Sequence, residues 1–197
     1  MRWHVSHKYD ARALPLADRH YNRRKPGSPQ FVPPGRALVL LTAAADAVWI
    51  TSWPFAEYVK HAWPGAWVNS LFRNEAPDAH LSSELIREAV AATRARWPEV
   101  PSLGMVTFVD PKKTRHKRDP GRCYRKAGFR VVGTTKKEGL IALQLLPADM
   151  PEPGEAMPIV REGLSLASLP LPLPRTPTES QVVGRDRNSR AASGLRR

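Results

Sequence analysis

Hydrophobic residues recur in two kinds of pattern along the first 146 residues. Alternating or continuous apolar runs bounded by turn residues are typical of strands, and apolar residues three and four positions apart indicate a helix. Because two pairs of the expected strands follow each other across short turns, we expect a mixed α/β (α+β) domain with a largely antiparallel sheet flanked by helices. The patterns predict strands over residues 37–42, 47–53, 66–72, 103–109, 129–134 and 139–146, and helical segments over 10–24, 80–96 and 119–127.

The C-terminal quarter of the chain has a different composition. From residue 149 onward it lacks sustained periodicity, contains no aromatic residue and includes the run L-P-L-P-L-P. Such segments bury too little apolar surface to offset the entropy of ordering. We expect one domain over residues 1–148 and a Pro-rich, basic, disordered tail over 149–197.

Two Asp-Pro pairs frame the stretch in which chemistry is expected. Asp110 ends the strand 103–109 before a proline, which stops a strand and places this carboxylate at the end of the sheet. Asp119 before Pro120 is typical of a helix N-cap, and this helix would carry Tyr124 one turn from its start. We therefore expect Asp110 and Tyr124 to lie side by side.

Positive charge is concentrated in the same stretch. The chain has a formal net charge of +13, and residues 111–137 contain eleven Lys or Arg against a single acidic residue, Asp119. Such a patch attracts polyanions, nucleic acid above all, although a merely solubilising face stays an alternative. The candidate DNA phosphate contacts are Lys112, Lys113, Arg115, Lys117, Arg118 and Arg122.

The chain has few features of a secreted or membrane protein. Its single cysteine, Cys123, excludes an internal disulfide framework and a Cys-rich zinc site. No segment approaches the roughly 20 apolar residues that span a bilayer. We expect a cytoplasmic protein without membrane contact.

The order of elements and the string C-Y-R-K-A-G-F at residues 123–129 resemble the Gcn5-related N-acetyltransferase fold. This resemblance implies that residues 1–148 form an acetyltransferase-like catalytic domain, with acetyl-CoA as a cofactor. The pyrophosphate-binding loop of that fold is rich in glycine, whereas the corresponding residues 73–83 here read R-N-E-A-P-D-A-H-L-S-S.

A narrower resemblance links the chain to the Mom family of phage DNA modification proteins. It rests on the order and spacing of a few positions, namely His20, Tyr21, Arg73, Ser83, Asp110 and Tyr124. The family converts adenine in DNA to a carbamoylmethyl derivative, modified at N6, and so evades host restriction. The resemblance implies a transferase acting on double-stranded DNA in the host cytoplasm.

The same resemblance implies roles for these residues. His20, Tyr21, Asp110 and Tyr124 are expected to act in catalysis and to bind iron, a metal suited to nitrogen and oxygen ligands. Arg73 and Ser83 are expected to bind the anionic part of a cofactor or a DNA phosphate.

Simpler interpretations stay open for each residue. His20 is equally typical of a surface helix, and the two tyrosines of core aromatics. In these interpretations Asp110 serves solely as a cap of the following loop, and Ser83, like Ser82, solely as a cap of the helix 80–96. Without a metal, Tyr124 would be a candidate general acid for a leaving thiolate and Asp110 a base for an amine.

Two other functions fit parts of the sequence. An acyl-CoA-dependent N-acetyltransferase would modify a small amine or a protein. A non-catalytic nucleic-acid-binding protein would use only the basic patch.

Overall fold

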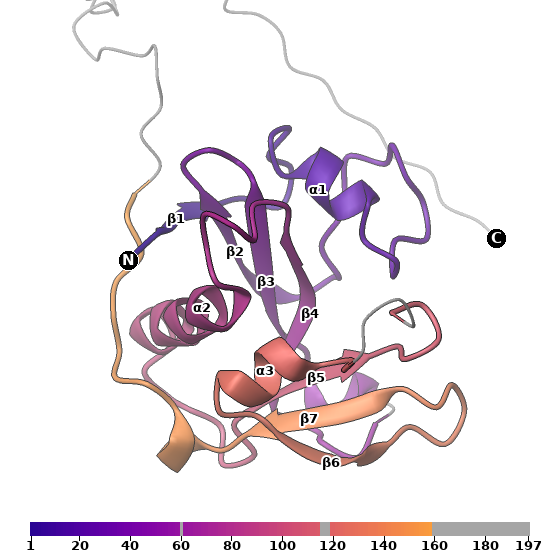
Figure 1. Cartoon of the computed structure of the whole chain (residues 1–197). Coiled ribbons are helices and arrows are strands. Elements are labelled where there is room, and N and C mark those ends of the chain that lie inside the picture. The colour runs from indigo at the N-terminus through magenta and orange to yellow at the C-terminus, as the bar shows by residue number, and fades with distance from the viewer. Residues whose placement is uncertain (60, 115–118, 159–197) are drawn as a thin grey trace, which may run out of the picture. The chain divides into compact units, whose positions relative to one another are not determined.

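The computed structural model describes residues 1–59, 61–114 and 119–158. Within these residues seven strands form one sheet in the order β1-β2-β3-β4-β5-β7-β6 (Figure 1). Neighbouring strands are antiparallel except β4 and β5, which are parallel. The strands are β1 (Trp3–Ser6), β2 (Arg36–Thr42), β3 (Ala47–Trp53), β4 (Trp67–Asn74), β5 (Met105–Val109), β6 (Arg130–Thr134) and β7 (Ile141–Leu145).

The helices are few, and one of them makes the parallel pair possible. Helix α2 (Ser82–Arg96) runs between β4 and β5 in the chain and so provides the crossover that parallel neighbours require. Helices α1 (Leu14–Asp18) and α3 (Arg122–Lys126) are short, and 3₁₀ turns cover Ala56–Tyr58 and Pro147–Asp149. No helix of the described residues combines the length and apolar character needed to cross a bilayer.

Two hydrophobic cores cover the two faces of the sheet. Because successive side chains of a strand point to opposite faces, Leu38 and Leu40 of β2 pack with α2, whereas Val39 and Leu41 pack with α1. Trp3 of β1 is fully buried in the first core, and its indole N–H donates to the Leu85 carbonyl of α2 over 2.8 Å. The sheet is thus held between helical layers on both sides.

The coarse fold expected from the sequence is confirmed. The chain forms a mixed α+β domain with a mostly antiparallel sheet, and every predicted strand is present, residues 47–53 with the predicted ends and the others with shifted ends. Strand β1 was not predicted, because four residues with one deeply buried side chain give no readable alternation. Helix α1 covers only the middle of the expected segment 10–24.

The start of α3 differs from the prediction. The helix begins at Arg122 rather than at residue 119, and its N-cap is Gly121, with φ of 78°. Asp119 does not cap the helix but forms an ion pair with Arg125. The N-cap of α2 is likewise Leu81, without a side-chain cap, and not Ser82 or Ser83.

The chain continues along the domain beyond the expected boundary at residue 148. Met157 forms a parallel bridge with His4 of β1, through hydrogen bonds with Trp3 and Val5 of 2.9 and 2.8 Å. The N–H of Gly154 donates to the Ala91 carbonyl of α2 over 3.1 Å. Residues 150–158 thus lie against α2 and the β1 edge, and residues 159–197 lie outside the described part.

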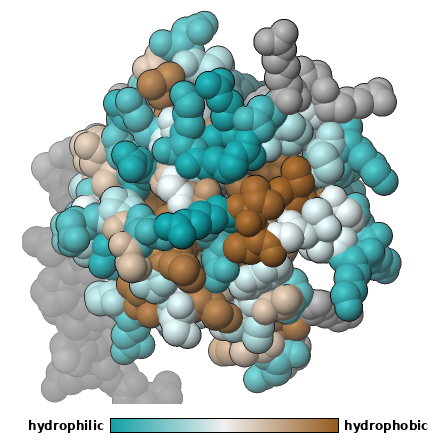
Figure 2. Space-filling view, turned by 60° about the horizontal axis from the view of Figure 1, so that its bottom comes forward, coloured by the Kyte–Doolittle hydropathy of each residue, from teal (hydrophilic) through white to brown (hydrophobic). Residues whose placement is uncertain are grey.

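The other edge of the sheet is β6. Figure 2 shows the molecule from the side that is at the bottom of Figure 1, where hydrophobic and hydrophilic patches alternate. Val131 and Val132 of β6 are among the exposed large hydrophobic residues. A shift in pairing between Val131 and Gly133 interrupts this edge, which discourages pairing with a further strand.

Candidate active site

A separation of two central strands opens the candidate site. β4 and β5 pair only over Trp67–Asn69 and Met105–Thr107. On its other side, β4 changes register against β3. Ile50 pairs with Leu71 and Thr51 with Asn69, so the residue of β4 between Asn69 and Leu71 has no pairing partner on β3. Such a bulge bends a strand, and Figure 1 shows β4 and β5 pointing apart toward their C-terminal ends.

A cavity of about 830 Å³ lies where these strands part. Its walls come from the ends of β4 and β5, the first turn of α2, helix α3 and the segment after α1. It brings together seven predicted residues from distant parts of the sequence: the site residues His20, Tyr21, Arg73, Ser83 and Tyr124, and the DNA contacts Lys113 and Arg122.

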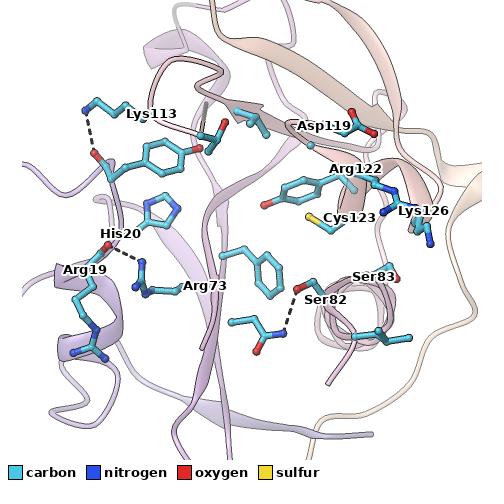
Figure 3. A pocket seen from close by; sticks show the side chains of 18 residues that line it. Arg19, His20, Arg73, Ser82, Ser83, Lys113, Asp119, Arg122, Cys123 and Lys126 are labelled. Atoms are coloured by element: carbon cyan, nitrogen blue, oxygen red, sulfur yellow. Dashed lines mark hydrogen bonds between the residues drawn. The ribbon is translucent and has the colours of Figure 1, made fainter. Parts of the chain in front are cut away.

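The lining of this cavity is strongly cationic. Of the residues that the structure describes, Arg19, Arg73, Lys113, Arg122 and Lys126 line it, against the single acidic residue Asp119. In Figure 3, Arg19 and Arg73 lie on one side of the cavity, and Arg122 and Lys126 on the other. The cavity therefore presents positive charge from two opposite walls and suits an anionic ligand.

A carboxylate outside the lining organises the two arginines. Glu75 accepts hydrogen bonds from Arg19 and from Arg73 Nε, and the Arg73 Nη1 donates to the Arg19 carbonyl over 2.7 Å. The hydrogen bond with Arg19 is the main cause that lowers the Glu75 pKa to about 2. Arg73 is thereby held against the segment that carries His20.

His20 is held neutral at the cavity wall. Burial, and then the nearby charge of Arg73, lower its pKa to about 4. The Asn22 backbone N–H lies 3.2 Å from His20 Nδ1, so Nδ1 is an acceptor and the ring hydrogen is assigned to Nε2. The ring stacks on that of Tyr21, with 4.4 Å between centroids.

Tyr21 and Asp110 meet at the end of β5. The Asp110 backbone N–H donates to the Tyr21 hydroxyl over 3.4 Å, and burial raises the pKa of Tyr21. The Asp110 carboxylate faces its own loop instead: Oδ1 accepts the backbone N–H groups of Lys112 and Lys113 over 2.8 and 3.2 Å. Asp110 therefore caps the loop and is not among the residues that line the cavity.

Tyr124 is the most buried of the predicted site residues. Its side chain packs edge-on against Phe72 and Phe129, and the residue is 8% exposed. Its hydroxyl donates to Asn69 Oδ1 over 2.7 Å. Burial raises the Tyr124 pKa well above its ordinary value, so the hydroxyl is not ionised at neutral pH.

The four residues expected to bind iron each have hydrogen-bond partners within the protein. The described residues contain no group of three His, Cys, Asp or Glu side chains placed to hold a metal ion. A metal on His20 Nε2 would leave the hydrogen on Nδ1, where it would face the Asn22 N–H, a second donor. Oδ1 of Asp110 accepts two loop N–H groups, and the Tyr124 hydroxyl hydrogen is donated to Asn69. Iron therefore stays a prediction, and we derive no chemistry through it.

Ser83 lies at the start of α2, across the cavity from Arg73. Ser83 is in the first turn, where backbone N–H groups have no acceptor within the helix. Ser82 accepts a hydrogen bond from Asn74 of 3.2 Å. Figure 3 shows both serines beside the cavity. The free amides of this first turn suit the phosphates of a cofactor, and Arg73 adds positive charge from the other side of the cavity.

Part of the predicted DNA-binding loop can be described. Lys113 lines the cavity, and its Nζ donates to the Tyr21 carbonyl over 3.2 Å. Lys112 is exposed and Arg122 lies at the cavity on α3. Arg115, Lys117 and Arg118 lie outside the described residues.

Several residues of the site were not predicted. Arg19, Cys123 and Lys126 line the cavity without any signal in the sequence. Asn69 did leave a signal, because an amide at an inward position of the strand W-V-N-S-L must find buried partners.

We compared the chain with family models, curated proteins and solved structures, and none of them matches.

Proposed function

We propose that the protein is a DNA-modifying transferase similar to the Mom family, which adds a carbamoylmethyl-type group to N6 of adenine. The observation that carries this proposal is the cavity between the separating strands β4 and β5. It combines cationic side chains from two walls with uncharged polar groups, among them His20, Tyr21 and Tyr124.

The sheet supports an acetyltransferase-like frame. The order of the elements along the chain and the tyrosine on the helix after β5 are the features on which the Gcn5-related N-acetyltransferase resemblance rests. We place group transfer at the cavity where β4 and β5 separate.

The charge and size of the cavity favour a nucleotide. Its volume of about 830 Å³ is within the range of roughly 300–1,000 Å³ that holds small ligands. A base inside a duplex must leave the stack before an enzyme reaches its amino group. Lys113, Arg122 and Lys126 would then hold the flanking phosphates, while Tyr124 faces the base.

An anionic cofactor would occupy the other side of the cavity. The resemblance implies acetyl-CoA, a thioester that would supply an acetyl group when bound; a carbamoylmethyl group also contains a nitrogen, which must come from a further reactant. Arg73 and the first amides of α2, at Ser83, would hold its phosphates. Pro77 in the preceding loop has no N–H to offer, which differs from the glycine-rich loop of ordinary acetyltransferases.

An acyl-CoA-dependent N-acetyltransferase acting on a small amine or protein is the second candidate. The observation that favours it is the N-terminus of α2 at the cavity, a site for cofactor phosphates that needs no DNA. The two functions predict different products, because only the first alters DNA.

Mass spectrometry of nucleosides tests the proposal. Plasmid DNA recovered from cells that express the protein should contain a modified deoxyadenosine. Unmodified DNA from cells that hold folded protein would exclude the proposed function, and acetyl-CoA turnover without DNA would then favour the second candidate. DNA binding without either activity would indicate a binding protein.

A further inference from the structure

Asn69 connects the bulge of β4 to the hydroxyl of Tyr124. The residue is 5% exposed and lies where the pairing of β4 with β3 changes register. Its Nδ2 donates to the backbone carbonyls of Ile50 and Leu71 over 3.1 and 2.9 Å. These two carbonyls belong to the residue pair that flanks the bulge, so the amide joins β3 to β4 where the ladder is interrupted.

The two carbonyls determine which way the amide faces. A backbone carbonyl only accepts hydrogen bonds, so the NH₂ group of Asn69 must point at Ile50 and Leu71. The oxygen Oδ1 must then point at the hydroxyls of Tyr124 and Thr107, which lie 2.7 and 3.1 Å away. Since Oδ1 can only accept, the Tyr124 hydroxyl has to be the donor.

We infer that Asn69 holds the hydroxyl hydrogen of Tyr124 inside the protein, so that Tyr124 faces the cavity as a hydrogen-bond acceptor. Asn69 is then a positioning residue, which acts on the substrate through Tyr124. The inference deepens the proposed function and rests on it for the identity of the substrate. It also changes the expected role of Tyr124, because a general acid needs its hydrogen directed at the leaving group.

The chemistry of the proposed substrate agrees with this polarity. The exocyclic amino group of adenine carries two N–H donors, and a neutral hydroxyl oxygen in the wall would accept one of them. Burial keeps the phenol neutral, so the contact would orient the amine without adding charge. The Thr107 hydroxyl lies beside both groups: it donates to the Asn69 backbone or side-chain oxygen and competes for neither Nδ2 hydrogen, and its interaction with the Tyr124 hydroxyl partly offsets the rise of the Tyr124 pKa caused by burial.

Ultraviolet resonance Raman spectroscopy of the full-length protein tests the inference, because the tyrosine Fermi doublet responds to whether the hydroxyl donates or accepts. Subtracting the spectrum of Tyr124→Phe isolates Tyr124 in the native protein. We expect a donor signature. An acceptor or unbonded signature would overturn the inference even if no other variant folds.

Two further variants separate Asn69 from its neighbour. Asn69→Ala should abolish the donor signature of Tyr124. Thr107→Val keeps the shape of the side chain, removes only the hydroxyl beside the same Asn69 oxygen, and should preserve the donor signature. A donor signature that survives in folded Asn69→Ala would overturn the role of Asn69. A donor signature in native protein that leaves DNA unmodified would refute the proposed function and uphold the orientation of Tyr124.

Discussion

The backbone N–H of Asp110 donates to the hydroxyl of Tyr21 over 3.4 Å, although the two residues are 89 positions apart. This contact joins the segment after α1 to the end of β5. The Asp110 carboxylate, by contrast, is used within its own loop. Asp110 therefore contributes to the site through its backbone and its cap.

Replacing Asp110 distinguishes a cap from a catalytic carboxylate. Asp110→Asn keeps an oxygen that can accept the two loop N–H groups, so we expect DNA modification within a few-fold of the native level. Asp110→Ala removes the acceptor and should lower stability by about 1 kcal/mol, a typical value for a lost cap. Denaturant unfolding and nucleoside mass spectrometry measure the two effects. Loss of modification in a stable Asp110→Asn variant would show that the negative charge is required.

The lowered pKa of His20 predicts a dependence of stability on pH. Between about pH 4 and 6.5 the unfolded chain binds a proton at this ring and the folded chain does not, so the free energy of unfolding should rise with pH across this window. The contribution is about 3 kcal/mol at most, from the size of the shift. Urea unfolding between pH 4 and 7 should show a flatter profile for His20→Gln.

The exposed His7 provides the control. His7→Gln should keep the native rise between pH 4 and 6.5. If His20→Gln keeps it as well, His20 is not buried as a neutral ring.

The cations of the cavity predict the salt dependence of DNA binding. Arg122→Gln and Lys126→Gln should each weaken binding of a duplex and reduce the slope of log affinity against log salt by about 1. Fluorescence anisotropy with a labelled duplex at several NaCl concentrations measures this slope. Arg87→Gln removes the same charge from an exposed position of α2 that does not line the cavity, and should leave the slope nearly unchanged. Equal slopes for all three variants would mean that DNA does not use the cavity.

Gly104, just before β5, tests how closely β5 packs against β7. Gly104 has φ of 63°, and a Cβ there would overlap the backbone carbonyl of Leu145. Gly104→Ala should therefore prevent folding or lower the melting temperature strongly. Gly27 has φ of 80° with open space around it, so Gly27→Ala should lose only about 1 kcal/mol. Thermal unfolding followed by circular dichroism compares the two, and similar melting temperatures would contradict the close packing of β5 against β7.

The sequence predicted the core elements because their periodicity is strong. The strand pair of residues 37–42 and 47–53 alternates between two buried faces, and α2 repeats its apolar residues at helical spacing. β1 was not predicted, because it depends on pairing with β2 and on Trp3 packing under α2. Such contacts join distant residues and leave little local pattern.

The site was predictable only where local sequence patterns determine it. The two Asp-Pro pairs placed Asp110 and Tyr124 at one end of the sheet, but the direction of the Asp110 carboxylate depends on the loop backbone. Asn69 acquires its role from a bulge between β3 and β4, and a shift of pairing by one residue cannot be read from one strand alone. Asp119 was predicted as a cap and is instead paired with Arg125.

The most direct measurement of the central claim is mass spectrometry of nucleosides from plasmid DNA, recovered after expression of native protein, Tyr124→Phe and Tyr9→Phe. Tyr124→Phe removes one buried hydroxyl at the cavity, whereas Tyr9 is 52% exposed and absent from the cavity lining. We expect a modified deoxyadenosine with native protein and Tyr9→Phe, and at least a tenfold reduction with Tyr124→Phe. Unmodified DNA from cells that contain folded native protein, or equal modification with Tyr124→Phe, would contradict the account.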